Sequence, residues 1–204
     1  MAFFGSESGV CMEWILASAS PRRKELLSEL LQSFEILPSK GEECIAGNPT
    51  PEELVKTLAL QKAAEVATYP QAAGKAVIGS DTVVALDGEI LGKPKNAAHA
   101  KEMLKALSGR SHEVYTGVCM IFPTEKGAET IVDAACTKVH FLPLTDKQID
   151  AYVATGSPMD KAGAYGIQDG GLVECIEGSF SNVVGLPLEL CQEMIKKVDE
   201  ARRK

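Results

Sequence analysis

Several signatures of common protein classes are missing from this chain of 204 residues. Aromatic residues contribute only 5%, and the apolar runs are short and interrupted, so no segment is predicted to span a bilayer. Acidic residues outnumber basic residues by 28 to 21, which gives a net charge of −7, and no Lys/Arg-rich block occurs. This balance argues against non-specific binding to nucleic acid or to an anionic membrane. We therefore expect neither among the partners of the chain.

Motifs of familiar enzymes and metal sites are missing as well. The sequence contains no phosphate-binding loop of the G-x-x-x-x-G-K-[ST] type, no G-x-G-x-x-G, no G-x-S-x-G and no H-E-x-x-H. Its six cysteines include no C-x-x-C pair, and its three histidines are isolated in the sequence. We therefore do not expect a zinc site.

Residues 1–12 have neither a basic segment nor a long apolar stretch, so they do not resemble a secretory signal, and we expect a flexible leader. No long polar linker interrupts the rest, so residues 13–204 are predicted to form a single domain. An even number of cysteines is compatible with disulfides. Without a secretory signal, free thiols in a reducing compartment are favoured, and we predict a cytoplasmic protein.

Helical and strand-like patterns alternate along the chain, which is typical of an α/β fold with a mixed sheet. Thr50 and Glu53 form a capping box that predicts a helix to about Thr68. The apolar run 76–86, followed by Asp87-Gly88, predicts a strand that enters a hairpin. Similar patterns predict further strands at 14–17, 34–37, 112–122, 130–142 and 172–184, and helices after Ser20, Asn96, Thr145 and Pro187.

Three features do not fit a sequence selected for folding alone, and the first is a cluster of cations. Arg22, Arg23 and Lys24 occupy the first turn of the helix that Ser20 is expected to cap. The helix dipole is positive at this end, so each exposed cation there costs about 0.3–1 kcal/mol. A bound anion would reverse the sign, because it would meet free N–H groups and the arginine side chains together. The alternative is that the cations simply extend into water.

The second feature is Asp81, which interrupts the apolar run 76–86. Strand alternation places its side chain on the same face as Gly79 and Val83. A carboxylate among apolar neighbours is costly to bury unless it is paired or binds a metal. A bulge or the end of the sheet would instead expose Asp81 harmlessly.

The third feature is the glycine-rich stretch 160–171. Glycine allows the backbone to approach a ligand closely, although a mobile surface loop has the same composition.

Taken together and in order, several blocks of the sequence resemble the Maf family, the septum-formation-inhibitor proteins regarded as nucleoside triphosphate pyrophosphatases. The resemblance covers about residues 13–200 and is highly specific as a set. The blocks are Ser18-Ala19-Ser20-Pro21-Arg22-Arg23, Gly79-Ser80-Asp81-Thr82, Gly92-Lys93-Pro94, Ser108-Gly109-Arg110, His112-Glu113-Val114-Tyr115-Thr116-Gly117, 160–168 and 182–187.

The resemblance implies an α/β fold similar to that of the inosine triphosphatases, with a mixed twisted sheet, helices on both sides and two lobes around a cleft. It also implies hydrolysis of a nucleoside triphosphate to the monophosphate and pyrophosphate with a divalent cation, Mg²⁺ or Mn²⁺. A homodimer is known among relatives, but we find no apolar patch in the sequence that indicates an interface.

Residue roles follow from the same resemblance. Asp81 matches the proton acceptor, and Glu43 with Asp81 matches the carboxylates near the metal. A solvated loop acid is the alternative for Glu43. The residues that match phosphate-binding positions are Ser18, Arg22, Arg23, Lys62 and Lys93.

Substrate preference is implied by three positions. Arg23, Thr82 and Gln168 match the residues of the subfamily that acts on dTTP and UTP. The amide of Gln168 can accept from N3–H of uracil and donate to O4. Asp169 adds a negative charge there without a family counterpart. A purine-directed enzyme acting on 7-methyl-GTP or inosine triphosphate, and a non-catalytic nucleotide-binding regulator of septum formation, are the alternatives.

Overall fold

The structure is a computed structural model that describes residues 12–203, so almost all of the expected leader lies outside the described residues. Met12, its last residue, is half-buried against the core. Among the described helices, none combines the length and the apolar character that crossing a membrane requires.

A mixed seven-stranded sheet organises the molecule. Its strands are β1 (Trp14–Leu16), β2 (Glu35–Ile36), β3 (Ala76–Leu86), β4 (Glu89–Leu91), β5 (Ser111–Thr124), β6 (Gly127–Phe141) and β7 (Val173–Glu177). The order is β2-β1-β3-β5-β6-β7, with β4 also paired to β3. The pairs that β1 makes are parallel and all others are antiparallel.

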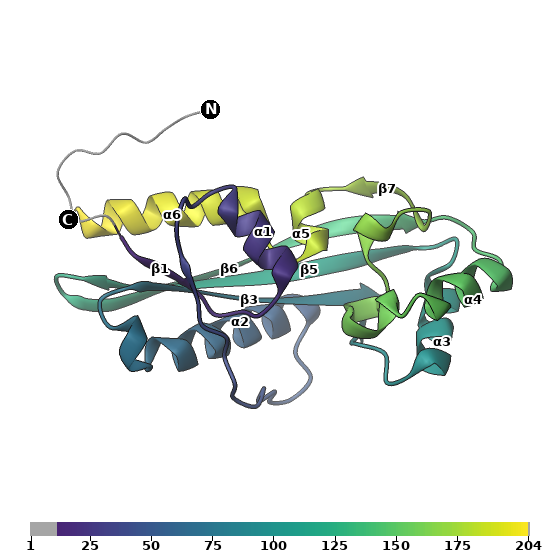
Figure 1. Cartoon of the computed structure of the whole chain (residues 1–204), viewed down its shortest axis with the longest axis horizontal. Coiled ribbons are helices and arrows are strands. Elements are labelled where there is room, and N and C mark those ends of the chain that lie inside the picture. Colours follow the sequence, from purple (N-terminus) through teal and green to yellow (C-terminus); the bar gives the residue numbers. More distant parts are fainter. Residues whose placement is uncertain (1–11, 204) are drawn as a thin grey trace.

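Helices cover both faces of this sheet, as the resemblance implied (Figure 1). The α-helices are α1 (Pro21–Ser28), α2 (Pro51–Ala67), α3 (Ala97–Leu107), α4 (Asp146–Ala154), α5 (Phe180–Val184) and α6 (Leu188–Arg202). The 3-10 turns are η1 (Pro70–Ala72), η2 (Ser157–Asp160), η3 (Ala162–Ala164) and η4 (Ile167–Asp169). Helix α2 lies on one face of the sheet, and α1 and α6 lie on the other (Figure 1).

Strand alternation explains this layering. Leu16 and Ile78 pack with Leu27 of α1 and Met194 of α6. Their chain neighbours on β1 and β3 point to the opposite face and pack against α2. One lobe therefore consists of the first strands with helices on both faces.

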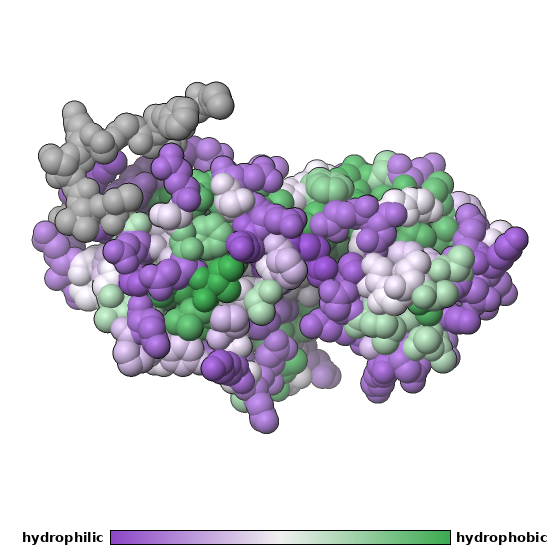
Figure 2. All heavy atoms as spheres, in the orientation of Figure 1, coloured by the Kyte–Doolittle hydropathy of each residue, from purple (hydrophilic) through white to green (hydrophobic). Residues whose placement is uncertain are grey.

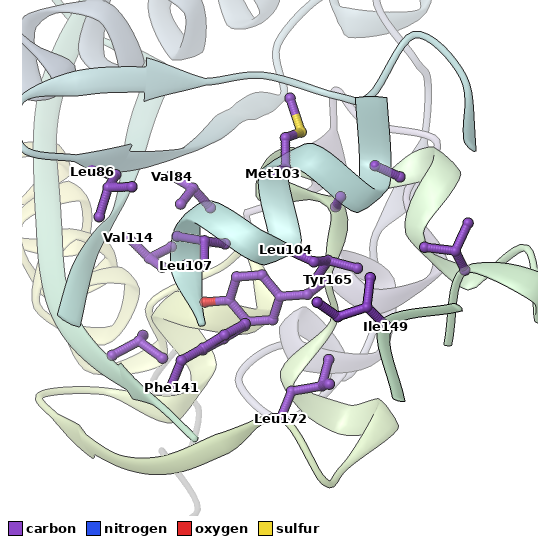
Figure 3. Packing of buried hydrophobic residues seen from close by; sticks show 14 residues of the cluster. Val84, Leu86, Met103, Leu104, Leu107, Val114, Phe141, Ile149, Tyr165 and Leu172 are labelled. Carbon is purple, nitrogen blue, oxygen red and sulfur yellow. The ribbon is translucent and has the colours of Figure 1, made fainter. Parts of the chain in front are cut away.

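The far end of the sheet carries the second lobe, whose core is separate. Phe141 and Tyr165 pack edge to face with ring centroids 4.7 Å apart, surrounded by leucines of α3 and by Ile149 of α4 (Figure 3). Buried His112 packs against both rings and shares a 2.7 Å hydrogen bond with the Tyr165 hydroxyl. The buried aromatic residues are shared between the lobes, because Trp14 and Phe122 lie in the core of the first.

Most predicted elements are confirmed. Thr50 and Glu53 form the predicted capping box, and β3 covers the run 76–86 before the hairpin to β4. Of the described cysteines, all are free thiols.

The prediction of one strand over 172–184 is wrong. The strand β7 ends at Glu177, Gly178 adopts φ of +128°, and the Ser179 side chain then caps α5 by accepting from Asn182 N–H. The pattern of this segment is strand-like, but the Ser179 cap decides the local structure at its end.

An interruption in pairing along β3 positions the site. On one edge of β3, β1 pairs with Ala76–Ile78 and β4 pairs with Val84–Leu86. Residues 79–83 lie between these two partners, and the described part of the chain offers them no strand on this edge. The other edge pairs continuously with β5. The missing strand leaves room beside β3 at the junction of the lobes.

Candidate functional site

A cleft of about 790 Å³ occupies this gap in the sheet. The molecule narrows between its lobes, and hydrophilic side chains gather at the junction (Figure 2). The cleft is lined by every site residue predicted from the sequence: Ser18, Arg22, Arg23, Glu43, Lys62, Asp81, Thr82, Lys93 and Gln168.

The start of α1 forms one wall. Ser20 caps the helix by accepting from Arg23 N–H, and Pro21 is its first residue, as predicted. The Ser18 hydroxyl oxygen accepts from Ser20 N–H at 3.2 Å and from Arg23 at 3.3 Å. Two serine side chains therefore fix the turn that delivers the arginines to the cleft.

The two arginines behave differently. Arg22 reaches across the cleft to the Asp160 carboxylate of the second lobe at 3.3 Å. Arg23 folds back into the protein, where its Nε donates to Gly185 O at 2.9 Å and its Nη2 donates to Thr82 Oγ1 at 3.1 Å. Burial lowers the pKa of Arg23, an effect that the charge of Asp81 opposes.

The acidic side of the cleft is built around Lys62 of α2. Its ammonium contacts the Asp81 carboxylate, and it lies 2.9 Å from Glu43 Oε1. The Asp81 side chain is 14% exposed and the Glu43 side chain 49%. Asp81 is therefore largely buried and paired, so the alternative of a harmlessly exposed aspartate is wrong.

Strand alternation separates two kinds of chemistry on β3. Asp81 points toward α2 and Lys62, whereas Thr82 points toward the α1 side and meets Arg23. Both residues lie in the stretch of β3 that has no partner strand on one edge. The Asp81 carboxylate and the Thr82 hydroxyl therefore both line the cleft.

The second lobe contributes the opposite wall. Lys93 follows β4, and Gln168 lies in η4. The neighbouring Asp169 accepts from the Tyr152 hydroxyl at 2.5 Å and from the Ser157 hydroxyl at 2.6 Å. The Asp169 carboxylate beside Gln168 is thus hydrogen-bonded within the second lobe, and these bonds help to hold the turn in which Gln168 lies.

Sequence reasoning missed residues that complete the cleft. Lys161 donates to Ser157 O at 2.6 Å and to Asp160 Oδ1 at 2.9 Å. Gly185 lies far from Arg23 in the sequence, and its backbone oxygen accepts a hydrogen bond from Arg23 Nε. The glycine-rich composition of 160–171 marked the segment of Lys161, and the resemblance marked the block 182–187 that holds Gly185, but no local spacing shows which distant groups either residue meets.

The donor set for a metal ion is small. Glu43 and Asp81 supply hard carboxylate oxygens and already share one cation, the Lys62 ammonium. Within residues 12–203, no group of three or more His, Cys, Asp or Glu side chains is placed to hold a metal. The pair therefore fits a hard divalent ion that completes its shell with water or phosphate oxygens, and it does not fit a closed protein cage.

Comparison with protein families identifies one that covers most of the chain. The family described as Maf-like protein matches residues 13–198. A dTTP/UTP pyrophosphatase of Bacillus cytotoxicus is 47% identical over 190 residues, which are 92% of this chain and 96% of that protein. A dTTP/UTP pyrophosphatase of Thermococcus gammatolerans is 52% identical over 178 residues, which are 86% of this chain and 91% of that protein.

Solved structures support the fold. The Ham1 protein of Staphylococcus aureus superposes with a TM-score of 0.54 at 16% identity, covering 91% of this chain and 99% of that one. A HAM1 protein of Coxiella burnetii superposes with a TM-score of 0.53 at 16% identity, covering 92% of this chain and 100% of that one.

Proposed function

Because the chain belongs to the family of Maf-like proteins, we propose that it is a nucleoside triphosphate pyrophosphatase that hydrolyses dTTP and UTP to the monophosphate and pyrophosphate. The observation that carries this proposal is the meeting of arginines, lysines and two carboxylates in one cleft. Cations at the start of a helix suit a polyphosphate, and an aligned carboxylate suits activation of water.

Different residues of the cleft bind the phosphates and activate the water molecule. Ser18, Arg22, Lys62 and Lys93 bind the triphosphate, and the three charged side chains among them stabilise the pyrophosphate as it leaves. Arg23, which the resemblance also places with the phosphates, is directed toward Thr82 and Gly185 O. Asp81 lies among these groups, where it orients a water molecule against the α-phosphorus and accepts its proton. The bond from the α-phosphorus to the bridging oxygen then breaks, and that oxygen leaves with the pyrophosphate.

A divalent cation, Mg²⁺ or Mn²⁺, is part of the proposal. Glu43 and Asp81 would hold it, since both offer hard oxygens and both already face one positive charge. When bound, such an ion supplies neutralisation of negative charge on the phosphates. Lys62 contacts both carboxylates. If the cation took its place beside them, the Lys62 ammonium would be free to bind the phosphates.

Labelled water tests this function directly. The protein is incubated with UTP, dTTP, 7-methyl-GTP or ITP and Mg²⁺ in H₂¹⁸O, and the products are analysed by mass spectrometry. We expect UMP or dTMP and pyrophosphate in equal amounts, with ¹⁸O in the monophosphate, because water attacks the α-phosphorus. Orthophosphate as the first product, or label in the pyrophosphate, would contradict the proposal.

The same experiment separates the alternatives. Nucleotide that stays bound and intact for hours with the metal present would indicate a binding regulator without chemistry. Faster turnover of 7-methyl-GTP or ITP than of UTP and dTTP would indicate a purine-directed enzyme.

A further inference from the structure

A chain of hydrogen bonds links the cleft to the interior above β3. Arg23 Nη2 donates to Thr82 Oγ1 at 3.1 Å, and Thr82 Oγ1 lies 3.0 Å from Thr116 Oγ1 on the neighbouring strand β5. Thr116 Oγ1 then donates to the backbone oxygen of Asn182 in α5 at 3.0 Å. The chain therefore joins residues of α1, β3, β5 and α5.

The two ends of this chain fix its direction. A guanidinium can only donate hydrogen bonds, and a backbone carbonyl can only accept them. The single hydrogen of Thr116 is directed to Asn182 O, so Thr116 must accept from Thr82. The hydrogen of Thr82 is thereby turned inward, away from the cleft. Its oxygen keeps one lone pair and offers a ligand an acceptor only.

The carbonyl at the inner end is held in place. Asn182 is fully buried, and its Nδ2 donates to Val114 O and to Thr137 Oγ1 at 2.9 Å each. Thr116 is also fully buried. Because neither residue is exposed to solvent or free to turn, water cannot reverse the direction of the chain.

The cleft end of the chain presents two complementary groups side by side. Arg23 uses Nε, one N–H of Nη1 and one N–H of Nη2 for the contacts the structure describes, so each terminal nitrogen retains a second N–H. A donor from Arg23 therefore stands next to the acceptor of Thr82.

We propose that Thr116 is a positioning residue that locks Thr82 as an acceptor, so that Thr82 and Arg23 select bases with a carbonyl beside a ring N–H. This inference rests on the proposed function and deepens it. Uracil and thymine carry that pair at N3–H and an adjacent carbonyl. Cytosine presents a bare N3 there and adenine a bare N1, so each would set one acceptor against another.

Gln168 would not supply this selection if its amide, in place of Thr82, accepted from N3–H. A side-chain amide carries a donor at one end and an acceptor at the other, and a half-turn exchanges them. Gln168 can therefore adapt to uracil or to cytosine. The Thr82 hydroxyl cannot adapt while Thr116 holds its hydrogen.

The test uses Thr116→Val, which removes the hydroxyl and keeps the shape. Asn182 O still accepts from Gly185 N–H at 3.0 Å, so the variant leaves that carbonyl partnered. The Thr82 hydrogen becomes free to point into the cleft and to donate to N3 of cytosine. We expect the ratio of kcat/KM for UTP to that for CTP to fall roughly tenfold, mainly through KM, as expected for one exchanged hydrogen bond. Thr116→Ser keeps the hydroxyl, so it is expected to retain the ratio of the unsubstituted protein.

Binding of UMP and CMP, followed by calorimetry, repeats the comparison without turnover. A shifted UMP-to-CMP ratio in Thr116→Val without any hydrolysis would support this inference and refute the proposed function. Hydrolysis of UTP with an unchanged ratio in the folded Thr116→Val variant would overturn this inference and leave the function intact. Equal use of UTP and CTP by the unsubstituted protein, or loss of preference in Thr116→Ser, would also overturn it.

Discussion

At the scale of single residues, Asp81 and Lys62 form the ion pair around which the acidic side of the cleft is built. The carboxylate is mostly buried and depends on the ammonium for compensation, and Glu43 shares the same partner. Asp81 could be identified from the sequence because a charge in an apolar strand needs an explanation. Thr116 could not, because threonine is common in strands and its value here comes from groups far apart in the chain.

Replacement of Asp81 by Asn preserves the shape of the side chain but removes its ability to accept a proton. We expect kcat for UTP to fall by about a hundredfold to ten-thousandfold, the usual contribution of a general base. The control is Asp87→Asn in the β3–β4 turn, where the exposed carboxylate pairs with Arg110 at 2.5 Å. Full activity in a folded Asp81→Asn variant, measured by pyrophosphate release, would remove Asp81 from the mechanism.

At the scale of elements, α2 reaches β3 and β5 through two glycines. A Cβ at Gly79 would lie 2.2 Å from Ala59 O, and a Cβ at Gly117 would lie 2.2 Å from Val55 O. The helix backbone therefore rests directly on the sheet, which brings Lys62 of α2 to Asp81. The sequence predicted both elements through capping and periodicity. It could not predict this close approach, because glycine within a strand also occurs at bulges.

The contact between α2 and the sheet can be tested with Gly79→Ala. The added methyl group clashes with backbone atoms that cannot rotate away, so we expect the free energy of unfolding to fall by about 3 kcal/mol. For a chain of this size the midpoint of thermal unfolding should fall by roughly 6–12 °C. Gly92→Ala is the matched control, because a Cβ there meets no atom within 4 Å. Equal unfolding midpoints for the two variants would show that α2 can move away without cost.

At the scale of the whole molecule, the sequence predicted the class of fold better than the arrangement of its parts. The site residues extend from Ser18 to Gln168 and come from several segments that are far apart in the chain. They meet because β1 and β4 pair with the two ends of β3 and leave its middle open. Strand order and register depend on contacts that are distant in the chain, so sequence patterns did not show this gap.

The stability of the whole molecule should respond to pH through His112 in the second lobe. Burial lowers the pKa of His112 to about 4, and the charge of His140 adds to the effect. In the unfolded chain a histidine has a pKa near 6.5, so between pH 6.5 and 4 the unfolded state takes up the proton and the folded state does not. The free energy of unfolding should therefore fall by about 3 kcal/mol across this interval as the pH is lowered.

Denaturant unfolding of the unsubstituted protein and of His112→Phe measures this effect. The carboxylates titrate in both proteins, so the difference between the two curves isolates the imidazole. The variant should lose this part of the pH dependence. Parallel curves from pH 7 to pH 4 would show that His112 is not held neutral by burial.

The strands β5 and β6 contribute side chains to both hydrophobic cores: Val114 and Val139 to one, Met120 and Ile131 to the other. The lobes are thus two ends of one continuous ladder of backbone hydrogen bonds. Any change in the width of the gap must bend that ladder, which resists deformation along its whole length. The two walls of the cleft consequently hold their arrangement before a nucleotide binds. Most of the conformational entropy lost on binding is therefore that of the nucleotide and not that of the protein.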